Sequence, residues 1–313
     1  MSRLQELIEQ GRFVVTAECP AIDGGPLEAV SERLAPYRPW VDAMNATDNP
    51  AAHAHCSPLA SALAIRHAGI EPVMQLVCRD RNRLALQAEI AGAALHGIDN
   101  LCCLTGDDVT AGDEPESRRV FDLDGPQLVR VATTMTQGRY LSGRKLEPAP
   151  RMFIGAVESP GSPPLHHRVE RGVKKWHAGA RFLQLQVVYE DAHFSAFMQG
   201  TVERGLAQRC ALIPSVCIVG SPKALRFMDE QVPGISVPAR VIERVESAPD
   251  PKAACFDLAV EFGRLCQATP GVAGIHIISF RKDDAVAQLC GALAIPPVTE
   301  RDSTSAHDAA LAL

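Results

Sequence analysis

The chain has 313 residues, of which 46% are hydrophobic and 22% are charged. This composition is typical of an ordinary soluble globular protein with enough apolar residues for a sizeable core. The net charge of −6 gives no electrostatic reason to expect a nucleic acid or an acidic membrane surface as a partner. Residues 1–7 form a charged, amphipathic helical start with no apolar signal core, and no run approaches the roughly 18 apolar residues of a membrane span. We therefore expect a cytoplasmic protein.

Ten cysteines are scattered along the chain, and no two of them form a CxxC pair. Most lie in apolar segments, so we interpret them as reduced core side chains in a reducing compartment. The local arrangement closest to a metal site is His53-Ala54-His55-Cys56. It has no second half at the spacing of zinc ligands, and we predict no metal site.

Short runs rich in Val, Ile and Leu alternate along the chain with longer segments of helical periodicity. The predicted strands are 12–18, 40–46, 72–78, 99–105, 152–158, 182–188, 211–218 and 273–279. The predicted helices are 27–36, 57–69, 82–97, 125–138, 166–179, 192–208, 221–231 with 238–247, 251–268 and 283–292. Eight βα units without a break in composition predict a single-domain (β/α)8 barrel over residues 1–295, followed by a partly disordered tail, 296–313. A doubly wound sheet is the alternative, although no Gly-x-Gly-x-x-Gly follows the first strand.

In such a barrel the functional groups gather at the carboxyl ends of the strands. Glu18 ends the first strand, where an apolar run stops at a carboxylate, and chemistry explains this position better than packing does. Polar residues end or line six further strands: Asn45, Thr47 and Asp48; Gln75 with Arg79-Asp80-Arg81-Asn82; Thr105-Gly106-Asp107-Asp108; Glu158; Gln184 and Gln186; and His276.

Two of these groups have a structural alternative. The charged residues of the third loop also suit a surface ion pair, and Asn82 is a good N-cap for the helix that follows. Gln184 and Gln186 share one face of the sixth strand, and buried amides need partners. We expect them to bind a polar ligand or neighbouring barrel residues.

Five sequence blocks together resemble the methylenetetrahydrofolate reductase family. They occur in the family's order over roughly residues 10–295 and are Thr16-Ala17-Glu18-Cys19-Pro20, Gln75-Leu76-Val77-Cys78-Arg79-Asp80-Arg81-Asn82, Leu104-Thr105-Gly106-Asp107, Lys175-Trp176-His177-Ala178-Gly179-Ala180 and Gly274-Ile275-His276. The resemblance implies a (β/α)8 barrel and an enzyme of one-carbon metabolism and methionine biosynthesis. It implies FAD as cofactor, NADH or NADPH as hydride donor, and conversion of methylenetetrahydrofolate to methyltetrahydrofolate or the reverse. Folate is then the substrate partner, and we expect a homo-oligomer with a methyltransferase or redox protein as a further partner.

The same resemblance implies roles for individual residues. Glu18 matches the catalytic acid, and Asp107 matches the acidic residue beside the flavin and the pterin, so both are expected in catalysis. Asp107, Gln186 and Lys282 are the expected folate ligands. The expected flavin ligands are Thr47, Gln75, Thr105, Gly106 and Asp107, together with the basic residues Arg168, Arg171, Lys174 and Lys175, which would meet the pyrophosphate.

Several positions depart from the family's pattern. Gln75 stands in place of a histidine, residues 156–164 replace a Tyr-Pro-Glu loop, and Ile278-Ser279-Phe280-Arg281 replace Tyr-Thr-Leu-Asn. These departures leave three alternatives open: a flavin-free variant, a pterin-binding barrel methyltransferase that works with a corrinoid partner, and a barrel subunit of a larger one-carbon redox complex.

Overall fold

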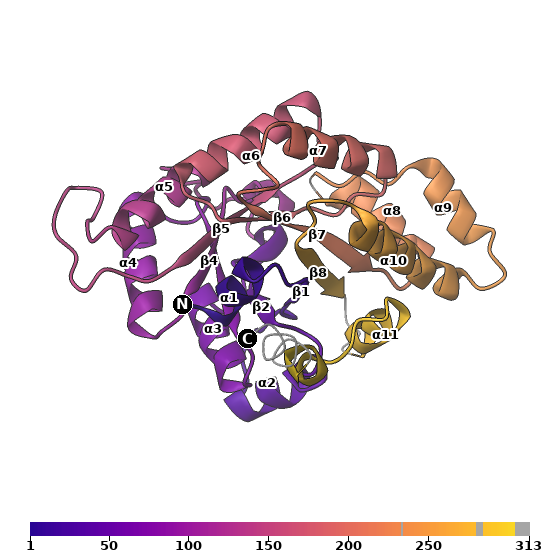
Figure 1. Ribbon diagram of the computed structural model, residues 1–313, viewed down its shortest axis with the longest axis horizontal. Coiled ribbons are helices and arrows are strands. Elements are labelled where there is room, and N and C mark those ends of the chain that lie inside the picture. The colour runs from indigo at the N-terminus through magenta and orange to yellow at the C-terminus, as the bar shows by residue number, and fades with distance from the viewer. Residues whose placement is uncertain (233, 280–283, 304–313) are drawn as a thin grey trace, which may run out of the picture.

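The computed structural model describes residues 1–232, 234–279 and 284–303. Eight parallel strands form a closed barrel in chain order, from β1 to β8, with helices around it (Figure 1). The strands are β1 Val14–Glu18, β2 Ala43–Ala46, β3 Pro72–Val77, β4 Asn100–Leu104, β5 Phe153–Glu158, β6 Phe182–Leu185, β7 Ala211–Ile218 and β8 Gly274–Ser279. The predicted (β/α)8 barrel is confirmed.

Helices alternate with the strands and cover the outside of the barrel. They are α1 Arg3–Glu9, α2 Leu27–Leu34, α3 Pro58–His67, α4 Arg83–Leu95, α5 Gly125–Thr136, α6 His166–Ala178, α7 Asp191–Glu203, α8 Pro222–Gln231, α9 Ala239–Glu246, α10 Pro251–Ala268 and α11 Ala285–Ala292, with short 3-10 turns at Pro50–Ala52 and Val109–Ala111. The α8 and α9 helices lie together at one side of the molecule (Figure 1). The predicted N-cap at Asn82 is confirmed, because its side-chain oxygen accepts hydrogen bonds from the N–H groups of Leu84 and Ala85.

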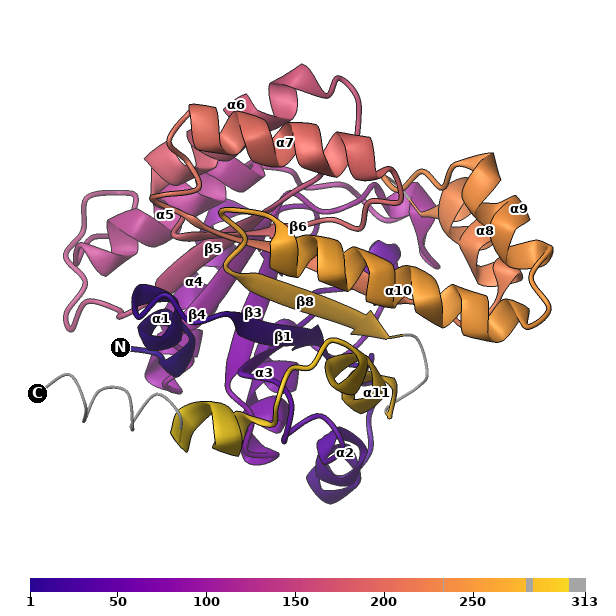
Figure 2. The same cartoon turned by 45° about the vertical axis from the view of Figure 1, so that its right-hand side comes forward.

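The interior of the barrel is apolar at the end where the strands begin. Its buried side chains come from seven strands and from α1: Leu4, Leu7, Val14, Ala43, Val73, Cys102, Phe153, Phe182 and Ile213. Gly155 leaves room for the Phe182 ring, since an added Cβ would lie 2.2 Å from that ring. The α1 helix covers this end, and the strands β1 and β8 point away from it (Figure 2). The opposite end is therefore the carboxyl end of the strands, which we call the mouth.

A layer of buried polar side chains lies between this apolar floor and the mouth. Its members are Thr16, Asn45, Gln75, Gln184, Ser215 and His276. Asn45 Nδ2 donates to Gln184 Oε1 at 2.8 Å across the barrel, and Thr16 Oγ1 lies 2.9 Å from His276 Nδ1. Four of the six are thus hydrogen-bonded in pairs, and the layer gives the mouth a polar base.

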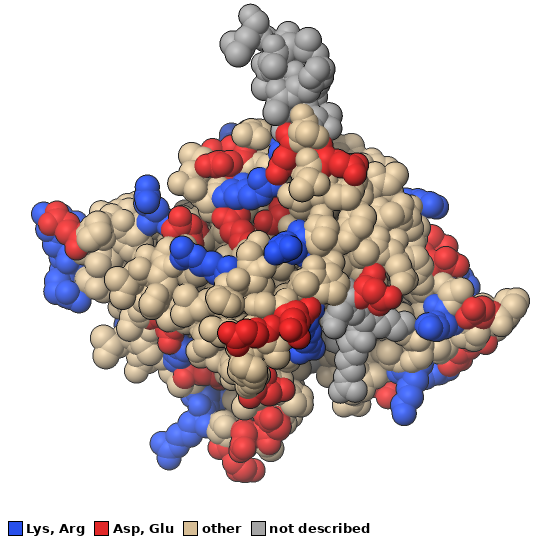
Figure 3. All heavy atoms as spheres, turned by 90° about the horizontal axis from the view of Figure 1, so that it is seen from below, with Lys and Arg blue, Asp and Glu red and all other residues tan. Residues whose placement is uncertain are grey.

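The outer core surrounds the strands with aliphatic side chains and thiols. Nine of the ten cysteines are buried, and all ten are free, which confirms their interpretation as core side chains. Acidic and basic side chains intermingle over the face in Figure 3, so no extended basic tract is visible among the described residues there. None of the helices in the described part of the chain has the length and apolar character needed to cross a bilayer.

The described start of the tail returns to the N-terminal side of the barrel. Residues 298–303 are helical, and Arg301 Nη1 donates to Asp42 Oδ2 at 2.6 Å. Asp302 accepts hydrogen bonds from Arg3 and Arg12 at 2.9 Å and 3.1 Å. The tail after Ser303 lies outside the described residues.

Candidate active site

Glu18 lies at the carboxyl end of β1, on the same interior face of the strand as Thr16. Parallel pairing places it beside Asn45 of β2, and Ala17 beside Ile277 of β8. No hydrogen bond or ion pair to its carboxyl group is found within the described residues. The residue keeps some solvent exposure, but protein atoms surround the carboxyl group, and this burial raises its pKa from 4.5 to about 7. Glu18 can therefore hold or release a proton near neutral pH.

The Gly106–Asp107 turn follows β4 at the same end of the barrel. Gly106 has a φ of +91°, a conformation that favours glycine, and an added Cβ would lie 3.1 Å from the side chains of Val77 and Arg79. Thr105 Oγ1 accepts a hydrogen bond from the N–H of Gly125 at the start of α5. Asp107 is half-buried, and burial raises its pKa while Arg79 opposes that rise.

The β2–α3 connection contributes a second buried acid to the mouth. Asp48 Oδ2 accepts hydrogen bonds from the N–H of Val77 at 2.8 Å and from Arg81 at 2.7 Å. Burial nevertheless raises the Asp48 pKa. Its Oδ1 atom is buried without a hydrogen-bond partner among the described residues. The adjacent Thr47, an expected flavin ligand, is also buried.

The three strand glutamines differ in how their amides are used. Gln184 Oε1 accepts a hydrogen bond from Asn45 Nδ2 of β2 across the barrel, so its amide is used by another barrel residue, one of the two roles expected from the sequence. Gln186, the expected pterin ligand, is half-buried, and its side-chain oxygen accepts from the N–H of Val187. Gln75 is buried, and no hydrogen bond to its amide is found within the described residues. Its amide is thus available to a ligand in the mouth.

The basic face of α6 surrounds one buried carboxylate. Val157 packs against the barrel interior, so Glu158 faces outward to α6 rather than into the mouth. Lys175 Nζ lies 2.5 Å from Glu158 Oε2 and also donates to the Val157 carbonyl. Arg168 and Arg171 lie 3.4 Å and 3.6 Å from the same carboxylate.

This cluster has an excess of positive charge that suits an anionic ligand. Three cations face one carboxylate, and the Arg171 side chain is 50% exposed. Lys174 is exposed on the same helix. The set therefore fits a phosphate group through Arg171 and Lys174, whereas Lys175 is already bound to Glu158.

The structure thus separates the predicted site residues into two groups. The strand ends and their loops bring Glu18, Thr47, Gln75, Thr105, Gly106, Asp107 and Gln186 to the mouth, while Arg168, Arg171, Lys174 and Lys175 lie on α6. Lys282 lies outside the described residues. Thr16 was not singled out from the sequence, although it stands two positions before Glu18 and so shares its face. A surface ion pair was the structural alternative for Arg79, and Arg79 does pair with Asp80, but its side chain is only 2% exposed.

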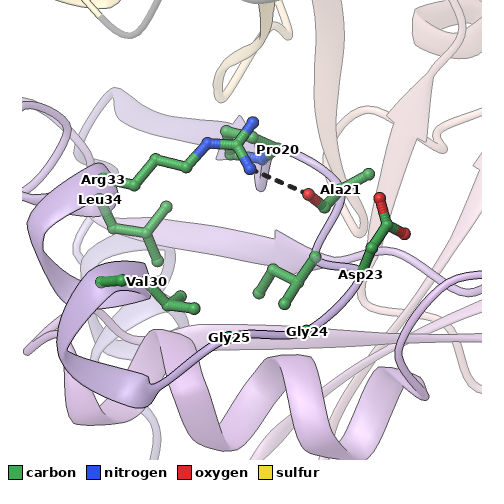
Figure 4. A pocket seen from close by; sticks show the side chains of 10 residues that line it. Pro20, Ala21, Asp23, Gly24, Gly25, Val30, Arg33 and Leu34 are labelled. Atoms are coloured by element: carbon green, nitrogen blue, oxygen red, sulfur yellow. Dashed lines mark hydrogen bonds between the residues drawn. The ribbon is translucent and has the colours of Figure 1, made fainter.

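An open cavity of about 550 Å³ begins two residues after Glu18 (Figure 4). The β1–α2 loop and α2 line it, with Ile22, Val30 and Leu34 as apolar walls. Arg33 donates to the carbonyl oxygen of Ala21 at 3.0 Å across it. This bond ties the loop to α2, so the guanidinium has a structural use at this position.

The histidine loop after β2 shows no metal-binding geometry. His55 Nδ1 lies 2.5 Å from Asp23 Oδ1, and His53 Nδ1 contacts the Ala51 carbonyl oxygen. Within residues 1–232, 234–279 and 284–303, no three His, Cys, Asp or Glu side chains are grouped so that they could hold a metal ion.

Comparison with known proteins gives one family and one fold. The sequence model of the family "Methylenetetrahydrofolate reductase" matches residues 3–294. A structure of an uncharacterized protein from Clostridium thermocellum that binds two copies of 5-methyl-5,6,7,8-tetrahydrofolic acid is 13% identical, with a TM-score of 0.63 over 93% of this chain and 99% of that chain. EDTA monooxygenase from Chelativorans sp. BNC1 is 11% identical, with a TM-score of 0.52 over 91% of this chain and 93% of that chain. No curated protein matches significantly.

Proposed function

Because the chain belongs to the methylenetetrahydrofolate reductase family, we propose that it is an oxidoreductase that converts methylenetetrahydrofolate to methyltetrahydrofolate, or the reverse, with NADH or NADPH as the hydride donor. The observation that carries this proposal is the carboxyl group of Glu18. It lies at the barrel mouth, has no partner within the described residues, and has a pKa raised to about 7.

The chemistry of the substrate requires such a group. One bond between the bridging carbon and a ring nitrogen breaks, the carbon takes a hydride, and the released nitrogen takes a proton. A general acid acts best when its pKa lies near the working pH. We assign this proton to Glu18, because near pH 7 about half of its carboxyl groups are protonated.

The folate ring system has several hydrogen-bond donors and acceptors, and the mouth has groups that complement them. We propose that the Asp107 carboxylate accepts from the pterin N–H groups. We assign the remaining ring atoms to the amides of Gln75 and Gln186. The buried Gln75 supports this assignment, and Gln186 would exchange its bond to the Val187 N–H for one to the ligand. The same-fold protein that binds 5-methyltetrahydrofolic acid supports folate as the ligand.

The chain also fits a flavin, which when bound supplies reversible hydride transfer between a nicotinamide and the folate. Arg171 and Lys174 would hold its phosphates, with Arg168 beside them, and Thr47, Thr105 and Gly106 would contact its ring. A flavin-free form of the same reaction is the second candidate. It is favoured by Lys175, since the buried ammonium is used by Glu158 instead of being free for phosphate.

The test is a kinetic comparison of wild type with Glu18→Gln. We expect folate reduction to fall by roughly two orders of magnitude or more, the usual scale for losing a general acid. Oxidation of NADH or NADPH by an artificial acceptor should remain, because it needs no proton from Glu18. Equal loss of both activities would contradict the assigned role. Flavin absorption of the purified protein distinguishes the flavin from the flavin-free form.

A further inference from the structure

Arg79 is a buried cation directly after β3, and none of the roles above uses it. Its side chain is 2% exposed, although charged side chains are rarely buried without partners. Arg79 Nε and Nη2 donate to Oδ1 and Oδ2 of Asp80 at 2.7 Å each. Asp80 Oδ2 also accepts from Asn49 Nδ2 at 3.2 Å. Such a two-point ion pair fixes the plane of the guanidinium.

The remaining bonds of Arg79 reach the neighbouring loops. Nη2 donates to the carbonyl oxygen of Asn49 at 3.2 Å, and Nη1 donates to the carbonyl oxygen of Asp107 at 3.4 Å. The Arg79 carbonyl oxygen accepts from the N–H of Val120 at 2.8 Å. One buried side chain therefore joins the loops after β2, β3 and β4.

Packing adds to these bonds at the Gly106–Asp107 turn. The turn lies so close to the aliphatic stem of Arg79 that an added Cβ on Gly106 would be 3.1 Å from the Arg79 Cβ atom. Both the stem and the guanidinium of Arg79 thus determine where the Asp107 backbone lies.

The charge of Arg79 also acts on Asp107. Burial raises the Asp107 pKa, and Arg79 opposes that rise. Three neighbouring aspartates each form an ion pair with an arginine: Asp80 with Arg79, Asp48 with Arg81, and Asp108 with Arg119. Among these groups, Arg79 is the cation that faces Asp107.

We propose that Arg79 is a positioning residue that holds the Gly106–Asp107 turn and keeps the Asp107 carboxylate available to the N–H donors of a pterin ring. The pterin part of this inference rests on the proposed function, whereas the control of Asp107 by Arg79 does not. A surface ion pair, by contrast, would be exposed to solvent and would hold neither the turn nor its carboxylate in place.

The first experiment needs no ligand. The Asp107 carboxyl group is titrated by ¹³C NMR in wild type, Arg79→Met and Arg79→Lys. We expect Arg79→Met to move the Asp107 titration to higher pH and Arg79→Lys, which keeps the charge, to stay near wild type. Arg83→Met is the matched control, because Arg83 forms its ion pair with Asp122 on the surface. An unchanged titration in Arg79→Met overturns the proposal.

The second experiment measures the affinity for methyltetrahydrofolate by calorimetry. Arg79→Met should weaken binding by roughly 10-fold to 100-fold, the scale for misplacing a binding group by about 1 Å. In an Asp107→Asn background the same change should add little, because the two residues act as one unit. Fully additive losses overturn the positioning role. If wild type binds no folate, the proposed function fails, and the titration alone decides the role of Arg79.

Discussion

Glu18 carries a stability cost that follows from its place in the mouth. Burial raises its pKa from 4.5 to about 7 in the folded protein. The folded state therefore binds the Glu18 proton more tightly than the unfolded state does. Its contribution to stability is complete below pH 4.5 and is lost as pH rises through 7. The carboxyl group that we propose as the general acid thus destabilises the protein at alkaline pH.

This cost predicts a change in stability for Glu18→Gln. At pH 8 the variant should be more stable than wild type by about 1–3 kcal/mol, because its neutral amide avoids burying a charge. At pH 4 the difference should be small, since both side chains are then neutral. Urea unfolding at both pH values measures it. A variant that is less stable at pH 8 would show that the carboxylate has a stabilising partner.

The position of Glu18 was predictable from the sequence, but its surroundings were not. An apolar run that stops at an acid shows that a carboxylate ends a strand. The contacts of Thr16 with His276, and of Asn45 with Gln184, join residues that are 260 and 139 positions apart. Such pairs depend on barrel closure and stagger, which local patterns do not encode.

At the scale of the element, α6 shows why a basic helix face is ambiguous. Helical spacing places Arg168, Arg171 and Lys175 together, and this was read from the sequence as a phosphate site. Glu158 lies ten or more positions before these residues, at the end of β5. The pleat of β5 turns the Glu158 side chain outward, away from the barrel interior. One helix face therefore holds a structural ion pair at Lys175 and exposed cations at Arg171 and Lys174.

Stability measurements separate these two uses of α6. Lys175→Met should destabilise the protein by about 3–5 kcal/mol, because it leaves Glu158 buried with weaker partners. Lys174→Ala, one position away on the exposed side, should change stability by less than about 0.5 kcal/mol. Chemical denaturation of both variants gives the comparison. Similar small losses in both would contradict a structural role for Lys175.

Flavin binding should show the opposite pattern. The double variant Arg171→Ala, Lys174→Ala removes two exposed cations but leaves the Lys175–Glu158 ion pair, so its unfolding midpoint should fall much less than that of Lys175→Met. It should lose flavin affinity by about tenfold or more, as expected for the loss of charge-assisted phosphate contacts. Fluorescence titration with FAD measures this. If wild type itself takes up no FAD, the flavin form of the proposed function is excluded.

At the scale of the whole molecule, counting apolar runs was sufficient to predict the barrel. The ends of all eight strands lie within three residues of their predicted positions, because each run is short, largely apolar and separated from the next by a segment of helical periodicity. The tail was less predictable. Residues 298–303 have no motif, yet Arg301 reaches Asp42 across 259 positions. The order of this segment depends on its partner Asp42, which lies at the end of the barrel where the strands begin.

This contact connects the tail to the strand that carries Glu18. Asp42 Oδ2 accepts from Arg301 at 2.6 Å and from the N–H of Val15 in β1 at 2.8 Å. Arg301 also donates to the Trp40 carbonyl oxygen. The Asp42 and Arg301 side chains are 1% and 11% exposed, so the pair is buried, whereas Asp302 is 38% exposed beside Arg3 and Arg12.

Because the Asp42–Arg301 pair is buried, we expect its loss to be costly. Arg301→Met should cost about 3–5 kcal/mol in the free energy of unfolding, because Asp42 keeps a buried charge without its main partner. Asp302→Ala, the exposed neighbour, should cost at most about 1 kcal/mol. Adding Asp42→Asn to Arg301→Met should restore part of the loss, since the neutral amide oxygen still accepts from Val15. Urea unfolding of the three variants tests this, and equal costs for Arg301→Met and Asp302→Ala would show that the tail is only a surface attachment.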